Sequence, residues 1–192
     1  IEDDKRLGQA NQLTVRLPYT ADKQPFGLPP NLYLLGTMNT ADRSIALMDT
    51  ALRRRFAFVE MMPDPTALDD DIEGVDVKAL FRALNDRIEH VFDRDHVIGH
   101  AYLCNLRSFE DLTQRLRQRI IPLLQEYFHE DWQKVRMIFK DGAKKAPNLH
   151  IIGKVTTPAA KLFGTEEGEF ESREQYAVAE QLTLEMVKAI YE

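Results

Sequence analysis

The chain has 192 residues, 44% hydrophobic and 29% charged, a balance typical of one or two globular domains. Its formal net charge of −6 excludes a bulk basic surface for nucleic acid, so any DNA contact must be local. The single cysteine, Cys104, excludes an internal disulfide and a thiolate-based metal site.

The chain shows neither a signal peptide nor an apolar run near the roughly 20 residues that span a bilayer. We therefore expect a cytoplasmic protein without membrane contacts, and one cysteine fits a reducing compartment.

Residues 1–12 are charged and compatible with a helix. Residues 13–19 then alternate apolar and polar side chains, which predicts a half-exposed strand. Residues 26–28 are short and apolar and follow a polar turn, so they are expected to return as a partner strand. Pro29 and Pro30 end this hairpin.

The next stretch, residues 31–58, predicts a strand, a polar turn, a short helix and a second strand. The apolar runs 32–35 and 56–59 suit buried parallel strands, and residues 45–52 form the amphipathic helix between them. Function-capable side chains lie at both ends of this helix: Asn39 and Asp42 before it, and Arg53, Arg54 and Arg55 after it.

Each of these polar residues has a functional and a plain structural interpretation. At the carboxyl end of a parallel strand, Asn39 has an amide that orients a water against a phosphate, but asparagine is also a common turn residue. Asp42 suits a helix cap, a metal ligand or a partner for a base. The three arginines suit phosphate oxygens, or a solvated helix end where the macrodipole favours cations.

An acidic run covers residues 64–73, and two histidines, His96 and His100, are four residues apart. The run suits either a metal site or a solvated linker with helix-capping carboxylates, and we favour the linker because no glycine-punctuated metal loop accompanies it. Gly99 interrupts a helix between the histidines and no third ligand is evident, so no metal site is expected.

The remaining pattern is mainly helical. Apolar residues recur at helical spacing in 77–92, 108–128 and 131–139. Ser108 is the expected N-cap of the second helix, and Pro122 should kink or split it. Residues 149–155 predict a strand, 164–171 an acidic loop, and 173–191 a final helix.

Residues 38–44 (MNTADRS) followed by 51–56 (ALRRRF) resemble the AAA+ NTPase module of McrB-type restriction motors. Residues 98–102 (IGHAY) and 121–128 (IPLLQEYF) resemble lid segments of the same family, so the resemblance covers residues 1 to about 140. It implies an α/β fold: the C-terminal part of a P-loop-type parallel sheet with sensor-one strand, arginine-finger helix and following strand. A mostly helical lid and a small C-terminal α+β extension complete it.

The resemblance implies three regions: 1–63 as the C-terminal part of the AAA+ core with its hairpin, 64–140 as the lid, and 141–192 as the extension. In AAA+ motors an excursion before sensor one often faces the ring pore. A sheet-edge hairpin without a ligand is the alternative, and the sequence favours it.

The implied site follows residue by residue. Asn39 takes the sensor-one position, Asp42 belongs to the loop needed for hydrolysis, and Arg54 and Arg55 are the pair that reaches a neighbour's nucleotide. Thr40, Arg43 and His100 are the further nucleotide-binding candidates, and no residue is assigned to a metal. His100 lies near the second-sensor position, but Val97 stands two residues before Gly99, which places that role in doubt, and a core histidine is the alternative.

The sequence contains no G-x-x-x-x-G-K-[ST] and no apolar strand ending in Asp-Glu. We therefore expect the phosphate cradle and magnesium ligand upstream of Ile1, and no hydrolysis by this chain alone. The resemblance implies an intact protein that uses GTP or ATP with Mg, forms a homo-oligomeric ring, expected to be a hexamer, and moves along DNA.

Its implied partner is a McrC-type nuclease that restricts modified DNA. Two alternatives stay open: a non-catalytic interaction module derived from AAA+, or a MoxR- or dynein-like ATPase that remodels proteins.

Overall fold

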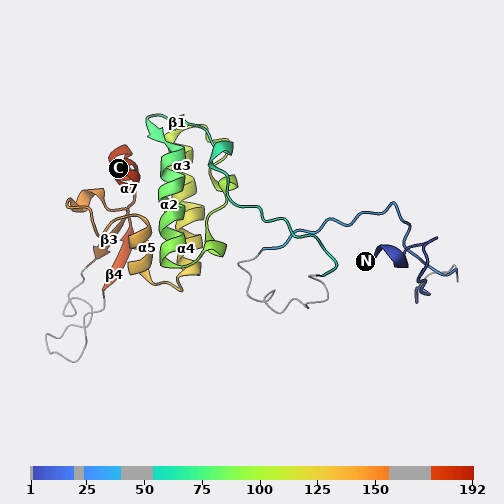
Figure 1. Cartoon of the computed structure of the whole chain (residues 1–192). Coiled ribbons are helices and arrows are strands. Elements are labelled where there is room, and N and C mark those ends of the chain that lie inside the picture. Colours follow the sequence, from blue (N-terminus) through green and yellow to red (C-terminus); the bar gives the residue numbers. More distant parts are fainter. Residues whose placement is uncertain (1, 20–23, 40–53, 156–173) are drawn as a thin grey trace, which may run out of the picture. The chain divides into compact units, whose positions relative to one another are not determined.

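A computed structural model describes residues 2–19, 24–39, 54–155 and 174–192. Contacts divide the chain into two units, residues 1–60 and 61–192 (Figure 1). No helix formed by the described residues is long and apolar enough to cross a lipid bilayer.

The first unit is built from turns and extended segments. The 3-10 turn η1 (Asp3–Lys5) lies near its start, and the expected pairing of residues 13–19 with 26–28 is present at one point. There Val15 and Phe26 exchange two backbone hydrogen bonds of 2.8 Å. The amide of Leu7 also donates to the carbonyl of Leu28 at 2.7 Å, which ties the start of the chain to the returning segment.

The two strands expected at 32–35 and 56–59 do not form in this structure. A strand needs at least one hydrogen-bonding neighbour, and within the described part of this unit the only β pairing joins Val15 and Phe26. Without neighbours the apolar run stays in water: Tyr33 is 89% exposed and Leu35 99%. The helix expected at 45–52 lies outside the described residues.

The second unit begins with the acidic run, which forms a small hairpin. Strands β1 (Asp71–Ile72) and β2 (Val75–Asp76) pair antiparallel through Glu73 and Gly74, whose φ angles of 50° and 90° suit a type I′ turn. Asp76 then caps α2 (Val77–Val91) by accepting the Ala79 amide at 2.8 Å. Within the acidic run itself, Asp64 accepts the Thr66 amide at 2.8 Å, the kind of cap that the linker interpretation expects.

The helix expected at 108–128 is split, as Pro122 predicts. It consists of α3 (Phe109–Arg115), a π-helical turn η6 (Leu116–Ile120) and α4 (Ile121–Tyr127). Ser108 is the N-cap, and its hydroxyl accepts the Asp111 amide at 3.2 Å. Because proline has no N–H to donate to the preceding turn, the wider π turn lies directly before it.

Apolar residues of α2 and of the α3–α4 rod share one core, and the two lie next to each other in Figure 1. The expected helix at 131–139 is α5 (Trp132–Ile138), capped by Asp131. Short 3-10 turns lie between α2 and α3, before β1, and between α5 and β3. They are η4 (Arg94–His96) and η5 (His100–Tyr102), η3 (Pro65–Ala67), and η7 (Pro147–Leu149), respectively.

The expectation of one helix over 173–191 is wrong for its first half. Residues Gln175–Val178 form strand β4, which pairs antiparallel with β3 (Ile152–Val155), and only Leu184–Tyr191 forms a helix, α7. Pairing with a segment about twenty residues earlier overrides the helical spacing of the apolar residues. Thr183 starts the true helix by capping the Met186 amide at 3.3 Å.

Described residues on both sides of position 140 share this core. The guanidinium of Arg87 on α2 donates to the carbonyls of Ile138 at 3.0 Å and Ile190 at 2.6 Å, and Ile152 is fully buried. The boundary expected near 63 lies close to the division at 60, while residues 141–192 belong to the second unit. The division into three regions remains a prediction.

Glu174, beside strand β4, should titrate far below other glutamates. Lys154 Nζ donates to its Oε1 at 2.5 Å, and the hydroxyl of Tyr176 and the amide of Gln133 donate to Oε2. These donors, Lys154 first, lower the pKa of Glu174 from 4.5 to about 2. Because the lowered pKa belongs to the folded state, the stabilisation is complete above pH 4.5 and is lost as the pH falls through about 2.

An NMR titration of the side-chain carboxyl carbon measures this directly. Lys154→Met should move the midpoint of Glu174 up toward 4.5, because it removes the largest cause of the shift. A midpoint that is already near 4.5 in the unaltered chain would contradict the contact.

Candidate functional site

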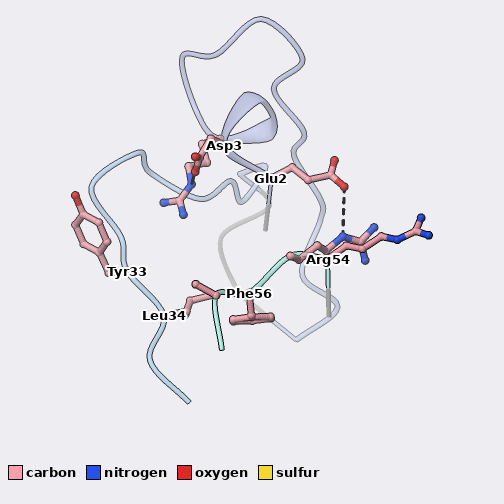
Figure 2. A pocket seen from close by; sticks show the side chains of 9 residues that line it. Glu2, Asp3, Tyr33, Leu34, Arg54 and Phe56 are labelled. Atoms are coloured by element: carbon pink, nitrogen blue, oxygen red, sulfur yellow. Dashed lines mark hydrogen bonds and ion pairs between the residues drawn. The ribbon is translucent and has the colours of Figure 1, made fainter. Parts of the chain in front are cut away.

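The arginines that follow the MNTADRS segment line a hollow of about 770 Å³ in the first unit. Figure 2 shows this hollow with side chains from both ends of the unit around it. Its lining residues are Glu2, Asp3, Arg6, Tyr33, Leu34, Arg54, Arg55, Phe56 and Ala57. The structure thus brings Arg54 and Arg55 to one cavity with acidic residues from the start of the chain.

Glu2 distinguishes the two arginines. Its Oε1 lies 3.3 Å from Arg55 Nε, and it also pairs with Lys5. Hydrogen bonds from Lys5 and then Arg55 hold the pKa of Glu2 below its ordinary value. Both arginines are exposed, but Arg54 forms no ion pair with any described residue, so its guanidinium has no acidic partner in this arrangement.

Arg6 is a structural residue that the sequence did not single out. Its Nη1 donates to the carbonyl of Leu32 at 2.5 Å and approaches those of Pro29 and Pro30 at 3.3 Å. Its Nε lies 3.2 Å from Asp3, within ion-pair reach but outside hydrogen-bond geometry. Arg6 therefore fastens the segment that leads to Asn39, and a charged N-terminal stretch carries no signal of this role.

The other predicted residues of the first unit are only partly placed. Asn39 is exposed at the end of the extended run and does not line the hollow. Thr40, Asp42, Arg43 and Arg53 lie outside the described residues. Arg54 and Arg55 therefore line the same hollow, and Asn39 is not among its lining residues.

His100 lies in the second unit, at the start of η5. Its Nδ1 is 3.1 Å from the backbone nitrogen of Asp64 and accepts that N–H. The neutral imidazole therefore carries its proton on Nε2. His96 has a separate environment: it is buried, its Nδ1 lies 2.6 Å from Asp93, and it packs edge-on against Phe92. The Nδ1 atoms of the two histidines thus have different partners.

The two residues that follow His100 in the sequence line a groove of about 560 Å³. Ala101 and Tyr102 form one side, and Pro122 and Leu123 of the α3–α4 rod belong to its lining together with Arg119 and Glu126. Arg119 carries no signal in the sequence, although Pro122 predicts an irregular helix at this place. Side chains from the π turn and from α4 thus define a partly apolar surface with one charge of each sign.

The match with known proteins falls on this same region. Residues 76–136 match the family model of the alpha-helical lid domain of McrB, from the N-cap of α2 into α5. The chain is also 33% identical over 153 residues to the type IV methyl-directed restriction enzyme EcoKMcrB subunit of Escherichia coli strain K12. The chain is of the McrB type.

The match covers 68% of this McrB-type chain and 32% of the relative, so the chain spans about a third of the length of the curated relative. The helices α2, α3 and α4 and the turn that carries His100 all belong to the matched lid. The MNTADRS and ALRRRF segments, which also resemble McrB-type proteins, precede the matched lid in the sequence.

Proposed function

We propose that this McrB-like restriction subunit is part of an AAA+ motor that hydrolyses GTP or ATP. The observation that carries the proposal is the order along the chain. A sensor-one loop and an arginine cluster, with Arg54 and Arg55 at one hollow, are followed directly by a helical segment that matches the McrB lid.

In this proposal Asn39 senses the γ-phosphate and orients the attacking water through its amide. Asp42 belongs to the loop at the subunit boundary that hydrolysis needs, and Thr40 and Arg43 of the same loop contribute to nucleotide binding. Arg54 and Arg55 reach the nucleotide of a neighbouring subunit, where a fixed positive charge stabilises the transition state. The exposed run at 32–35 supports a further part of the proposal, because its apolar side chains suit a strand of the AAA+ parallel sheet once neighbouring strands are present.

Magnesium is implied by the nucleotide chemistry. The described residues gather no set of carboxylates for it, so this part of the chain does not fit the ion. The proposed work of the chain is to position and stabilise the phosphates with an amide and two guanidinium groups.

The proposed partners are further copies of the subunit in a ring, expected to be a hexamer, a McrC-like nuclease, and DNA. The relative's name describes a methyl-directed restriction enzyme, which supports modified DNA as the target. With a net charge of −6 the DNA contacts would be local.

The test is a reconstitution of the intact protein with a McrC-type nuclease. We expect hydrolysis of GTP or ATP, and cleavage of methylated DNA but not of unmethylated DNA, both lost in Asn39→Ala. If a protein substrate stimulates hydrolysis while the nuclease and DNA have no effect on it, a remodelling ATPase is favoured. If the protein neither binds nor hydrolyses nucleotide but still binds the nuclease, a non-catalytic interaction module is favoured.

A further inference from the structure

His100 contacts the residue at which the chain enters the lid. The bond from the Asp64 amide to His100 Nδ1 lies four residues after the division between the two units. The carboxylate of Asp64 binds Thr66. Its Oδ1 accepts hydrogen bonds from the backbone amide of Thr66 at 2.8 Å and from the hydroxyl of Thr66 at 2.7 Å. Asp64 is therefore held by η3 from one direction and by His100 from the other.

The segment that carries His100 is itself fixed to the lid core. Both amide atoms of the Asn85 side chain bind the backbone of Ile98, with 2.7 Å from Ile98 N to Oδ1 and 3.0 Å from Nδ2 to Ile98 O. Ile98 is buried, and Arg115 donates to the carbonyl of Cys104 at 2.6 Å beyond the histidine. Because the backbone is hydrogen-bonded on both sides of His100, the position of its imidazole is fixed relative to the lid core.

We propose that His100 is a positioning residue that fastens the entry of the lid, instead of a direct nucleotide ligand. Its unprotonated Nδ1 holds the backbone of Asp64, which sets the path of residues 61–63 where they leave the lid toward the arginine-bearing unit. In hydrolysis, a step that rests on the proposed function, His100 would act through this linker. Its Nε2 would not need to touch a phosphate.

Two amide substitutions separate the alternatives. The side-chain oxygen of asparagine takes a position like that of Nδ1, whereas the longer glutamine places its amide like Nε2. In the 192-residue chain, His100→Asn should keep the Asp64 amide protected from hydrogen exchange. His100→Gln and His100→Ala should raise its exchange rate about two- to tenfold, the range expected for one lost hydrogen bond.

The amide of Ile98 is the internal control, because Asn85 holds it independently of His100. Its protection should stay unchanged in all three variants and so report an intact lid. In the unaltered chain the nitrogen NMR shift of His100 Nδ1 should be that of an unprotonated acceptor. Protection of Asp64 that survives His100→Gln and His100→Ala, or that is lost in His100→Asn, would overturn the proposal.

The intact protein supplies a second readout. If His100 positions the linker, His100→Asn retains hydrolysis and His100→Gln loses it. If Nε2 contacts the nucleotide, the order reverses and the positioning role is wrong. An intact protein that does not hydrolyse nucleotide at all would defeat the proposed function, while the exchange result would still decide what His100 does.

Discussion

Arg54→Ala in the intact protein is expected to slow nucleotide hydrolysis by about a thousandfold or more, the range in which arginine fingers contribute. The guanidinium of Arg54 is exposed and unpaired among the described residues, whereas Glu2 binds Arg55. A charge that acts on the transition state of a neighbour's nucleotide changes kcat and not ground-state affinity. Turnover at saturating nucleotide and the nucleotide Kd, measured separately, check both parts of this expectation.

Arg82→Ala is the matched control, because Arg82 is an exposed arginine on α2 and is not among the residues that line the hollow. It should leave the rate unchanged. Arg54→Lys should not restore the rate, since a lysine lacks the planar fork that matches phosphate oxygens. Retained turnover in Arg54→Ala would remove this residue from the proposed site.

Action on a neighbour is testable by mixing two inactive subunits, Arg54→Ala and a variant whose phosphate-binding loop is disabled. In mixed rings some interfaces combine an intact loop with an intact arginine, so part of the activity should return. Absence of any recovery, with mixed rings shown to form, would mean that Arg54 does not act across the interface.

The largest effect on stability is expected from Asp141→Ala, which should lower the free energy of unfolding by about 3–5 kcal/mol. Asp141 is fully buried and accepts the amides of Ile151 at 3.0 Å and Ile152 at 2.8 Å. It also pairs with Lys144 at 2.9 Å, and burial, opposed by this contact, lowers the pKa of Lys144. Without the carboxylate, two buried N–H groups lose their acceptor, and the Lys144 ammonium loses its counter-charge and keeps only the carbonyl of Leu149 at 3.0 Å.

Urea denaturation of the 192-residue chain measures this cost. Asp141→Asn keeps an acceptor for one backbone amide and should destabilise less. The double variant Asp141→Ala with Lys144→Met should recover part of the loss, because no unpaired charge then stays buried. Strictly additive effects of the two substitutions would show that the pair does not interact as the geometry implies.

The helices of the lid and the McrB-type relationship can both be predicted without a structure. Apolar spacing near 3.6 residues predicts 77–92, 108–128 and 131–139 correctly, because each helix closes its hydrogen bonds within its own segment. The break near Pro122 was predictable for the same local reason: the missing N–H belongs to the residue itself. The MNTADRS and ALRRRF segments likewise show their resemblance in sequence alone.

Contacts between residues that are distant in sequence could not be predicted and are seen only in the folded chain. Residues 175–178 are a strand because β3 pairs with them, and residues 32–35 are not one because the described chain offers no neighbour. The pairs Glu2–Arg55 and Asp64–His100 join residues 53 and 36 positions apart. No local pattern encodes such partners, since strand pairing and side-chain contacts depend on which segments the folded chain brings together.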